Sequence, residues 1–426
     1  MYPHWVCEGY RLYKSIIADL RGKFDKSYFR VWNPWFLNRS QWFSEEEIQT
    51  LQLEGLKKLF DHARRNTKYY KDIPNIMSLE DLERIPILTK KKIRENFQQL
   101  RAANVPGFKV STSGTISKSV TIKDKRLKFD FGERRFLSWY KTSLKKVCKL
   151  WDIEPSQGGR HLHLSIDFLK TREDAIRYLR LVERFKPDLI QAFAVPMRFL
   201  AHYALKEGIR PDVGVIQTAC ENLVPEARRE IEEAFQCEVY NFYGSRELGS
   251  MAQDCEKHGD LHIEAERYIV EEVDGRLLFT DLLDYAMPLI RYENQDTGEL
   301  SSAKCPCGRG LPTLKSILGR TFDYLLTKKD KWINLHALTH PIVEYEVFDW
   351  VEAFQFRQVE KGKVTVLLKP WSDSEKIPDS DALKKILYEQ VLRDELDVCV
   401  EIVDSPILSK SGKQVRVITD FSPWNE

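Results

Sequence analysis

The segment Ser111–Ser117 packs five hydroxyl side chains and one glycine into seven residues, STSGTIS. Successive backbone N–H groups and hydroxyl donors bind phosphate oxygens well, and a glycine lets the backbone approach them closely. Ser113, Gly114 and Thr115 are therefore candidate phosphate contacts, with Lys118 nearby as a countercharge. The segment is not a G-x-x-x-x-G-K-[ST] loop, and an ordinary polar surface loop is the alternative interpretation.

A second candidate group lies in NFYGSRELG, residues 241–249. Tyr243 offers an aromatic face on which a nucleotide base can stack, and Gly244 follows it directly. The carboxylate of Glu247 can hold a magnesium ion that bridges phosphates. The alternative is a turn that carries a solvated pair of Arg246 and Glu247.

Two further stretches carry one candidate each. Asp296 lies in a polar turn at the end of DLLDYAMPLIRYENQD, and its carboxylate can accept hydrogen bonds from two ribose hydroxyls. A turn aspartate satisfied by its own backbone is the alternative. Lys413 lies in the small-residue loop SKSGK, just before the last predicted strand. A lysine there can deliver positive charge to a developing transition state, although most lysines at loop tips are only solvated.

Three thiols and an imidazole form a candidate metal site. They occur as C-x2-H and C-x-C, at Cys255 and His258 and at Cys305 and Cys307. This donor set is sufficient for a tetrahedral zinc ion without an open position, so the predicted role is structural and would pin the 250s loop to the 300s loop. His262 is the alternative imidazole, and four unrelated residues are the simplest competing interpretation.

The pattern of apolar residues predicts the elements that position these groups. A capping box at Ser44–Glu47 opens a helix that is predicted to run to about Arg65. The middle of the chain alternates strand-like runs with amphipathic helices, which predicts an α/β fold with mixed or parallel sheets flanked by helices, and ligands in loops at strand C-terminal ends. The predicted strands cover 188–195, 214–220 and 274–282, and a helix covers 225–235.

Beyond Arg320 the pattern changes to short strands around one helix. We therefore predict a large domain over 1–319 and a small α+β domain over 320–426, with the boundary within 318–325. The predicted strands of the small domain cover 352–359, 363–369 and 398–404, and its helix covers 381–392.

Composition excludes several classes of protein. The 66 Lys and Arg residues nearly cancel the 64 Asp and Glu residues, so no bulk basic field indicates nucleic acid as a partner, and this also argues against a zinc-stabilised nucleic-acid-binding module. The chain shows no signal peptide and no apolar run of the length that spans a bilayer. We expect a cytoplasmic monomer or homodimer.

In this order and at these separations, the stretches resemble the acyl-adenylate-forming enzymes. More narrowly, they resemble the phenylacetate–coenzyme A ligase family and its relatives from capsular polysaccharide gene neighbourhoods. The matching stretches are STSGTISKS, TACENL, FYGSRE, DLLDYAMPLIRYENQD, CPCGRGLPTLKSILGR and SKSGKQVRV. The resemblance covers essentially the whole chain, and DLLDYAMPLIRYENQD is its most specific part.

The resemblance implies a two-step reaction. A carboxylate attacks the α-phosphate of magnesium-bound ATP and pyrophosphate leaves; the acyl group then passes from the adenylate to coenzyme A, an amine, a hydroxyl or a carrier-protein thiol. It also implies that the small domain is a mobile lid, and that some relatives carry a structural zinc ion where the cysteines lie. The implied roles are phosphate binding for Ser113, Gly114 and Thr115, adenine contact for Ala219, Cys220, Glu221 and Tyr243 beside Gly244, magnesium for Glu247, ribose for Asp296, the ribose or phosphate side for Arg320, and catalysis of adenylation for Lys413.

The chain departs from the family pattern at three places. Ser117 stands where a glycine is usual, Arg246 where a threonine is usual, and Phe322 where the hinge acid is usual. These departures leave open a catalytically degenerate, nucleotide-binding scaffold. The identity of the acid, aryl or otherwise, and the acyl acceptor are also open, and a role in surface polysaccharide biosynthesis is an expectation from the resemblance alone.

Overall fold

The computed structural model describes most of the chain in several stretches. The described residues are 34–111, 120–124, 139, 145–151, 153–169, 172–219, 223–320, 324–330, 332–334, 351–370, 383, 385, 395–405, 417–419 and 421. Among them, no helix is both long and apolar enough to cross a membrane.

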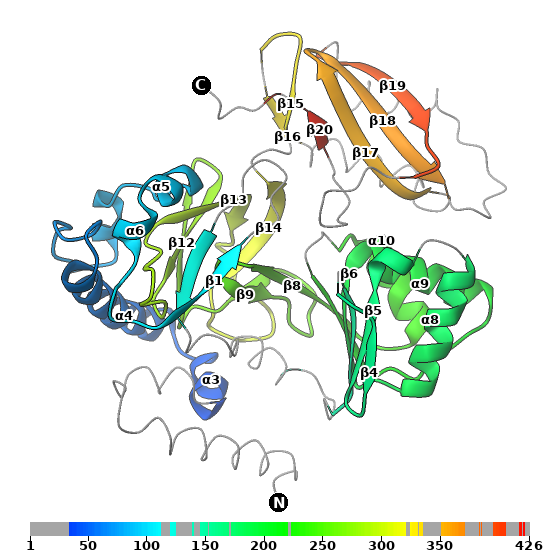
Figure 1. Ribbon diagram of the computed structural model, residues 1–426, viewed down its shortest axis with the longest axis horizontal. Coiled ribbons are helices and arrows are strands. Elements are labelled where there is room, and N and C mark those ends of the chain that lie inside the picture. Colours follow the sequence, from blue (N-terminus) through cyan, green and yellow to red (C-terminus); the bar gives the residue numbers. More distant parts are fainter. Residues whose placement is uncertain are drawn as a thin grey trace, which may run out of the picture.

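A twelve-stranded mixed sheet organises the larger part of the molecule (Figure 1). Its strand order is β11-β12-β13-β14-β10-β9-β8-β7-β6-β3-β5-β4. One half is parallel and consists of β5 (His161–Ser165), β3 (Val147–Trp151), β6 (Leu189–Phe193), β7 (Val215–Ala219) and β8 (Val239–Ser245), with β4 (Ser156–Gly158) antiparallel at its edge. The other half is antiparallel and consists of β9 (Gly249–Gln253), β10 (Leu261–Ile263), β14 (Thr313–Arg320), β13 (Tyr292–Leu300), β12 (Arg276–Asp281) and β11 (Tyr268–Val273).

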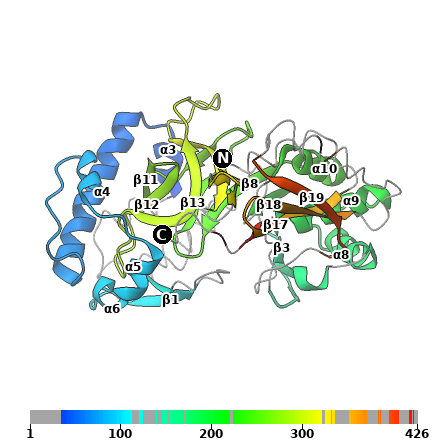
Figure 2. The same cartoon turned by 90° about the horizontal axis from the view of Figure 1, so that it is seen from above.

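Helices cover the parallel half from its outer side, as Figures 1 and 2 show. These helices are α8 (Arg172–Phe185), α9 (Ala194–Lys206) and α10 (Pro225–Phe235), and the short η3 (Ile166–Phe168) precedes them. Leu179 and Val182 of α8 pack with Ile190 and Ile216 of the strands in one buried core. Strands β6 and β7 are buried along their whole length, as expected where both faces of a parallel sheet are covered.

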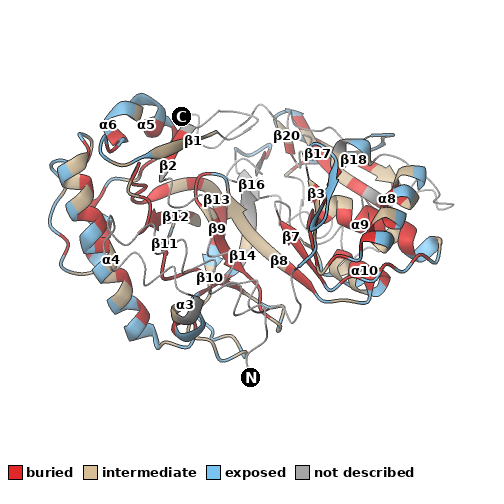
Figure 3. Ribbon diagram, turned by 60° about the horizontal axis from the view of Figure 1, so that its bottom comes forward, coloured by how far each residue is buried: buried red, intermediate tan, exposed pale blue. Residues whose placement is uncertain are grey.

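The antiparallel half packs against the N-terminal helices. These elements are α3 (Pro34–Ser40), α4 (Glu45–Asn66), η1 (Glu80–Arg84), α5 (Lys90–Glu95) and α6 (Phe97–Leu100). The capping box predicted at Ser44 and Glu47 is present, because each side chain accepts the other residue's backbone N–H. Helix α4 buries Leu56, Leu59 and Phe60 in one core with Phe279 of the sheet. Figure 3 shows that the helix carries both buried and exposed residues along its length.

The remaining strands form three smaller sheets. A hairpin joins β1 (Gly107–Ser111) to β2 (Val120–Asp124), and a second short pair joins β15 (Tyr324–Leu326) to β16 (Trp332–Asn334). The C-terminal sheet has the order β19-β18-β17-β20, with β17 (Val351–Glu360), β18 (Lys363–Pro370), β19 (Asp397–Ile402) and β20 (Val417–Thr419). Val364, Val366 and Leu368 of β18 form its core with Phe356.

The predicted fold class, α/β with a C-terminal α+β part, is confirmed. Each predicted strand and the predicted helix at 225–235 correspond to an observed element. Of the helix predicted over 381–392, the structure describes Leu383 and Lys385, both helical. The division at residues 319 and 320 stays a prediction, although β14 belongs to the large sheet through Arg320.

Candidate active site

Tyr243 and Asp296 meet at one edge of the large sheet. The hydroxyl of Tyr243, near the C-terminal end of β8, donates a hydrogen bond of 2.6 Å to Oδ2 of Asp296 on β13. The carboxyl ends of parallel strands are the usual place for ligands in open α/β sheets. The contact therefore joins the predicted base-stacking ring to the predicted ribose carboxylate at such an edge.

The antiparallel half must curl for this contact to form. Strands β9, β10 and β14 lie between β8 and β13 in the sheet order, and neighbouring strands are about 4.8 Å apart. A flat sheet would hold β8 and β13 about 19 Å apart, yet the Tyr243 and Asp296 side chains are in hydrogen-bond contact. A second contact also joins β13 to the end of β8. The hydroxyl of Tyr292 on β13 donates to Glu247, just beyond β8, at 3.1 Å.

Glu247 is a buried carboxylate with only 4% of its surface exposed. Oε1 accepts from Tyr292 and lies 3.6 Å from the ammonium of Lys90, the first residue of α5. Burial, and then the charge of Glu247, raise the pKa of Tyr292 well above its usual value, so Tyr292 remains a hydroxyl donor. Magnesium is typically bound by one or two carboxylates together with substrate phosphates, and Glu247 fits that limited protein contribution.

The residues around Glu247 leave little conformational freedom to its backbone. The carbonyl of Leu248 accepts from the Lys123 ammonium at 3.1 Å, from Arg267 Nη2 at 2.8 Å and from the hydroxyl of Tyr268. The Arg267 guanidinium also binds the fully buried Asp281 through Nε at 3.2 Å and Nη2 at 2.8 Å. Three donors on one carbonyl fix the peptide that follows Glu247.

Gly244 is required where β8 bends into the turn. A Cβ at this position would lie 2.7 Å from the carbonyl oxygen of Gly249 on β9 and 3.0 Å from the ring of Phe242. Backbone oxygen cannot move aside as a flexible side chain can, so any larger residue would separate β8 from β9. Gly244 therefore has a packing role beside Tyr243.

Two other predicted residues flank this region. Ala219 is the last residue of β7 and lies beside Phe242 of β8, one strand from Tyr243. Arg320 is the last residue of β14, and its backbone is paired opposite Asp296. Arg246 is exposed. The predicted residues Ser113, Gly114, Thr115, Cys220, Glu221 and Lys413, and the departures Ser117 and Phe322, lie outside the described residues.

The four donors of a candidate metal site converge elsewhere in the antiparallel half. Ligand atoms of Cys255, His262, Cys305 and Cys307 all lie within 4.8 Å of one another. Cys255 Sγ is 3.7 Å from Cys305 Sγ, and Cys307 Sγ is 3.4 Å from His262 Nε2. A tetrahedral zinc ion with bonds of about 2.3 Å to sulfur separates two sulfurs by about 3.8 Å, so the donors fit this ion.

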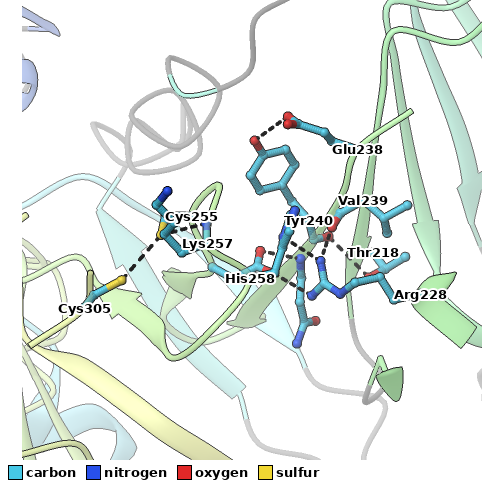
Figure 4. A network of polar contacts seen from close by, with 11 residues as sticks. Thr218, Arg228, Glu238, Val239, Tyr240, Cys255, Lys257, His258 and Cys305 are labelled. Carbon is cyan, nitrogen blue, oxygen red and sulfur yellow. Dashed lines mark hydrogen bonds and ion pairs between the residues drawn. The ribbon is translucent and has the colours of Figure 1, made fainter. Parts of the chain in front are cut away.

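The structure corrects the imidazole of this group from His258 to His262. His258 has a left-handed backbone with φ of 51°, and its Nδ1 lies 2.8 Å from Arg228 Nη1 and 3.3 Å from Asp254 Oδ2 (Figure 4). His262 instead lies on β10, fully buried and directed at Cys307. Burial lowers the pKa of His262 to about 4, which keeps the imidazole neutral as metal ligation requires.

The thiols of the group have unequal acidities. Burial raises the pKa of Cys255 and of Cys305. Burial acts in the same direction on Cys307, but hydrogen bonds from Arg309 outweigh it and lower the pKa of Cys307. The backbone N–H of Arg309 donates to Cys307 Sγ at 3.4 Å. Cys307 is therefore the thiol that most readily becomes the thiolate that zinc binds.

Arg309 also joins the cysteine loop to the N-terminal segment. Its guanidinium lies 4.2 Å from the ring centre of Trp139 and 5.2 Å from that of Trp42. It binds Glu256 through Nη1 at 2.9 Å and Gln41 through Nε at 2.7 Å. A guanidinium between two indoles with both ends hydrogen-bonded is a rigid clamp rather than a solvated arginine.

Sequence reasoning missed Lys90, Asn294 and Arg309 and placed His262 only as an alternative. Asn294 donates to both Tyr243 and Asp296, at 2.7 Å in each case. In the sequence, only the nearby candidate Asp296, two residues later, pointed to Asn294. Lys90 and Arg309 carried no local signal, because their partners lie far away in the chain.

The chain is similar to known proteins over most of its length. A phenylacetate–coenzyme A ligase of Thermus thermophilus is 26% identical over 323 residues, which are 66% of this chain and 72% of that protein. Protein CapK of Staphylococcus aureus is 22% identical over 391 residues, 82% of this chain and 83% of that protein. A solved 2-hydroxyisobutyryl-CoA ligase in the postadenylation state shares the fold, with a TM-score of 0.72 at 16% identity over 90% of this chain and 92% of that one. No family model matches the chain.

Proposed function

Because this chain belongs to the phenylacetate–coenzyme A ligase family of acyl-adenylate-forming enzymes and is an AMP-forming acid ligase, we propose that it activates an aryl acid with ATP and transfers the acyl group to coenzyme A. In the first step a carboxylate oxygen bonds to the α-phosphorus, the bond to the bridging oxygen breaks, and pyrophosphate leaves. In the second step the thiol sulfur attacks the acyl carbon, its proton passes to solvent, and AMP leaves.

The described residues supply the nucleoside half of the site. Tyr243 would offer its ring to adenine, Asp296 would accept hydrogen bonds from the ribose hydroxyls, and Glu247 would hold a magnesium ion. The ion, when bound, neutralises charge on the phosphate oxygens. Arg320 is paired with Asp296 across β13 and β14, and we assign it to the ribose or phosphate side of the nucleotide. Adenylation is then mainly positioning and charge neutralisation, which oriented side chains can provide.

One observation carries this proposal. Tyr243 to Asp296 at 2.6 Å and Tyr292 to Glu247 at 3.1 Å bring residues about 50 positions apart into one group, across three intervening strands. A solvated Arg246–Glu247 turn, the simpler interpretation of the sequence, does not require Glu247 to be buried beside Lys90 and Tyr292.

We also infer that the loops containing Cys255, His262, Cys305 and Cys307 bind a structural zinc ion. Four protein donors complete a tetrahedral site and leave no position for a substrate. The group belongs to the core around Ile48 and Leu311. Zinc would therefore act on stability, not on the chemistry.

The acid and the acceptor are tested by pyrophosphate exchange and thioester formation. The protein is assayed with ATP, magnesium and a panel containing phenylacetate, benzoate, 2-hydroxyisobutyrate and acetate. We expect exchange with an aryl acid and acyl transfer to coenzyme A. Exchange without transfer to coenzyme A would favour an amine or sugar hydroxyl acceptor and the surface polysaccharide role. Magnesium–ATP binding without exchange for any acid would indicate the degenerate scaffold.

Lys413→Ala tests the predicted catalytic lysine. Removing one charge that acts on the transition state costs about 100- to 1,000-fold in rate, so we expect exchange to fall by that factor with an unchanged melting temperature. Lys361→Ala is the matched control, because this lysine is paired with Asp330 in the same C-terminal part of the chain. Unchanged exchange in Lys413→Ala would remove this residue from the mechanism.

A further inference from the structure

We propose that Asn294 is a positioning residue that holds the adenine-stacking ring of Tyr243 and the ribose carboxylate of Asp296 as one hydrogen-bonded unit. The inference rests on the proposed function, because it concerns how the same site recognises a ribonucleoside. Asn294 lies on β13, two residues before Asp296, and only 6% of its surface is exposed.

The contacts of Asn294 use both ends of its amide. Nδ2 donates to the hydroxyl oxygen of Tyr243 and to Oδ2 of Asp296, at 2.7 Å in each case. Oδ1 accepts the backbone N–H of Asp296 at 3.1 Å. A carboxylate only accepts hydrogen bonds, so the opposite amide orientation would place two acceptors against each other. The chemistry of the partners thus fixes which end of the amide faces Asp296.

The three side chains form a closed triangle. Tyr243 donates to Asp296 Oδ2 at 2.6 Å and accepts from Asn294, while Asn294 donates to the same Oδ2. Hydrogen bonds to a charged acceptor are stronger than those between neutral groups. Two donors on one oxygen therefore fix the rotation of the carboxylate, and the same contacts fix the position of the Tyr243 hydroxyl.

The backbone of β13 is bent to make this triangle. Asn294 and Asp296 lie two positions apart, on the same face of β13, and their side chains are in contact. Gln295, between them, has φ of 72°, in the left-handed region that non-glycine residues rarely occupy. Strain of this kind persists where surrounding contacts demand it, and it clusters at binding sites.

This arrangement gives Asn294 a defined share in nucleotide recognition. Both groups that it holds would touch the nucleoside, one through the base and one through the sugar. Without Asn294, the Asp296 carboxylate would lose one hydrogen-bond donor and the Tyr243 hydroxyl would lose a donor that links it to β13. Tyr243 keeps its own bond to Asp296 in the absence of Asn294, so the loss should fall mainly on substrates with ribose hydroxyls and less on analogues that lack them.

The test compares ATP with 2′,3′-dideoxy-ATP in pyrophosphate exchange. A charged hydrogen bond discriminates by about 10- to 100-fold, so the wild type should prefer ATP by that factor in kcat/KM. We expect Asn294→Ala to raise KM for ATP by about tenfold, to change KM for the dideoxy analogue by less than about threefold, and to leave kcat within about threefold. Asn294→Thr keeps one donor and should discriminate to an intermediate degree.

Controls separate this role from a purely structural one. Glu299 lies on the same strand as Asn294 and forms an exposed ion pair with Lys315 of β14, so Glu299→Gln should retain wild-type discrimination. A structural role for Asn294 would raise KM for both nucleotides equally and lower the melting temperature. Should Asn294→Ala fail to fold, Asn294→Thr decides the question alone.

The outcomes also separate this inference from the proposed function. A wild-type protein that neither binds magnesium–ATP in calorimetry nor exchanges pyrophosphate would refute the proposed function, and the role of Asn294 with it. An active wild type whose preference for ATP survives in both Asn294 variants would refute only the role of Asn294.

Discussion

The buried pair of Arg267 and Asp281 should show strong energetic coupling. The two residues are 3% and 0% exposed, and the guanidinium makes two hydrogen bonds to the carboxylate. Removing one partner of a buried pair leaves an uncompensated charge and typically costs about 3–5 kcal/mol. We therefore expect Arg267→Met and Asp281→Leu each to destabilise the protein by that amount.

The double variant should be more stable than either single variant. Its remaining cost is the backbone N–H of Leu283, which loses Asp281 Oδ1, at about 1–3 kcal/mol. The carbonyl of Leu248 would still accept from Lys123 and Tyr268. The costs of the two single variants sum to about 6–10 kcal/mol, whereas the double variant should cost about 1–3 kcal/mol. The difference is the coupling energy between the two residues, which is at least about 3 kcal/mol.

Urea unfolding followed by tryptophan fluorescence can rank the stabilities of the two single variants and the double variant, since the chain contains ten tryptophans. The exposed pair of Lys315 and Glu299 is the matched control, with a coupling expected below about 1 kcal/mol. A double variant of Arg267 and Asp281 that unfolds at lower urea than both single variants would show that the pair is not a buried, mutually compensating unit.

Two further predictions concern the metal group and acid stability. Cys305→Ser should abolish bound zinc in metal analysis and lower the melting temperature while the order of acid preference stays the same; a wild-type melting curve would refute a bound metal. Glu230 is partly buried, which raises its pKa, but His202 and Arg198 outweigh this effect and hold the pKa below its usual 4.5. Its stabilisation is therefore present above pH 4.5 and is lost as pH falls through the lower value. Glu230→Gln should cost about 1–3 kcal/mol at pH 7 and flatten the loss of stability below pH 4.5 in pH-dependent urea unfolding; an unchanged acid limb would refute this assignment.

The features that were predictable from the sequence are those that depend on residues a few positions apart in the chain. The capping box at Ser44 and Glu47 spans three positions, and the helix at Pro225–Phe235 repeats its apolar residues every three to four positions. Strands β6 and β7 are largely apolar and are buried along their whole length, as expected for buried parallel strands. Each of these patterns requires no knowledge of a distant partner.

The features that were not predictable depend on pairing between distant segments. His262 joins the cysteines because β10 pairs with β14, which places it opposite Thr313 and beside the 305–307 loop. His258 has the more conventional spacing from Cys255, but a left-handed turn directs its ring at Arg228 and Asp254. Spacing along the chain cannot distinguish these two outcomes.

The pair of β8 and β9 connects the two sites. The backbone of Asn241, two residues before Tyr243, accepts from Asp254 N at 3.1 Å and donates to Asp254 Oδ1 at 2.6 Å. Asp254 precedes Cys255 in the chain, and Arg228 of α10 binds its other oxygen at 2.6 Å. One buried carboxylate therefore holds together a helix of the parallel half, the strand that carries Tyr243 and the first cysteine of the metal group.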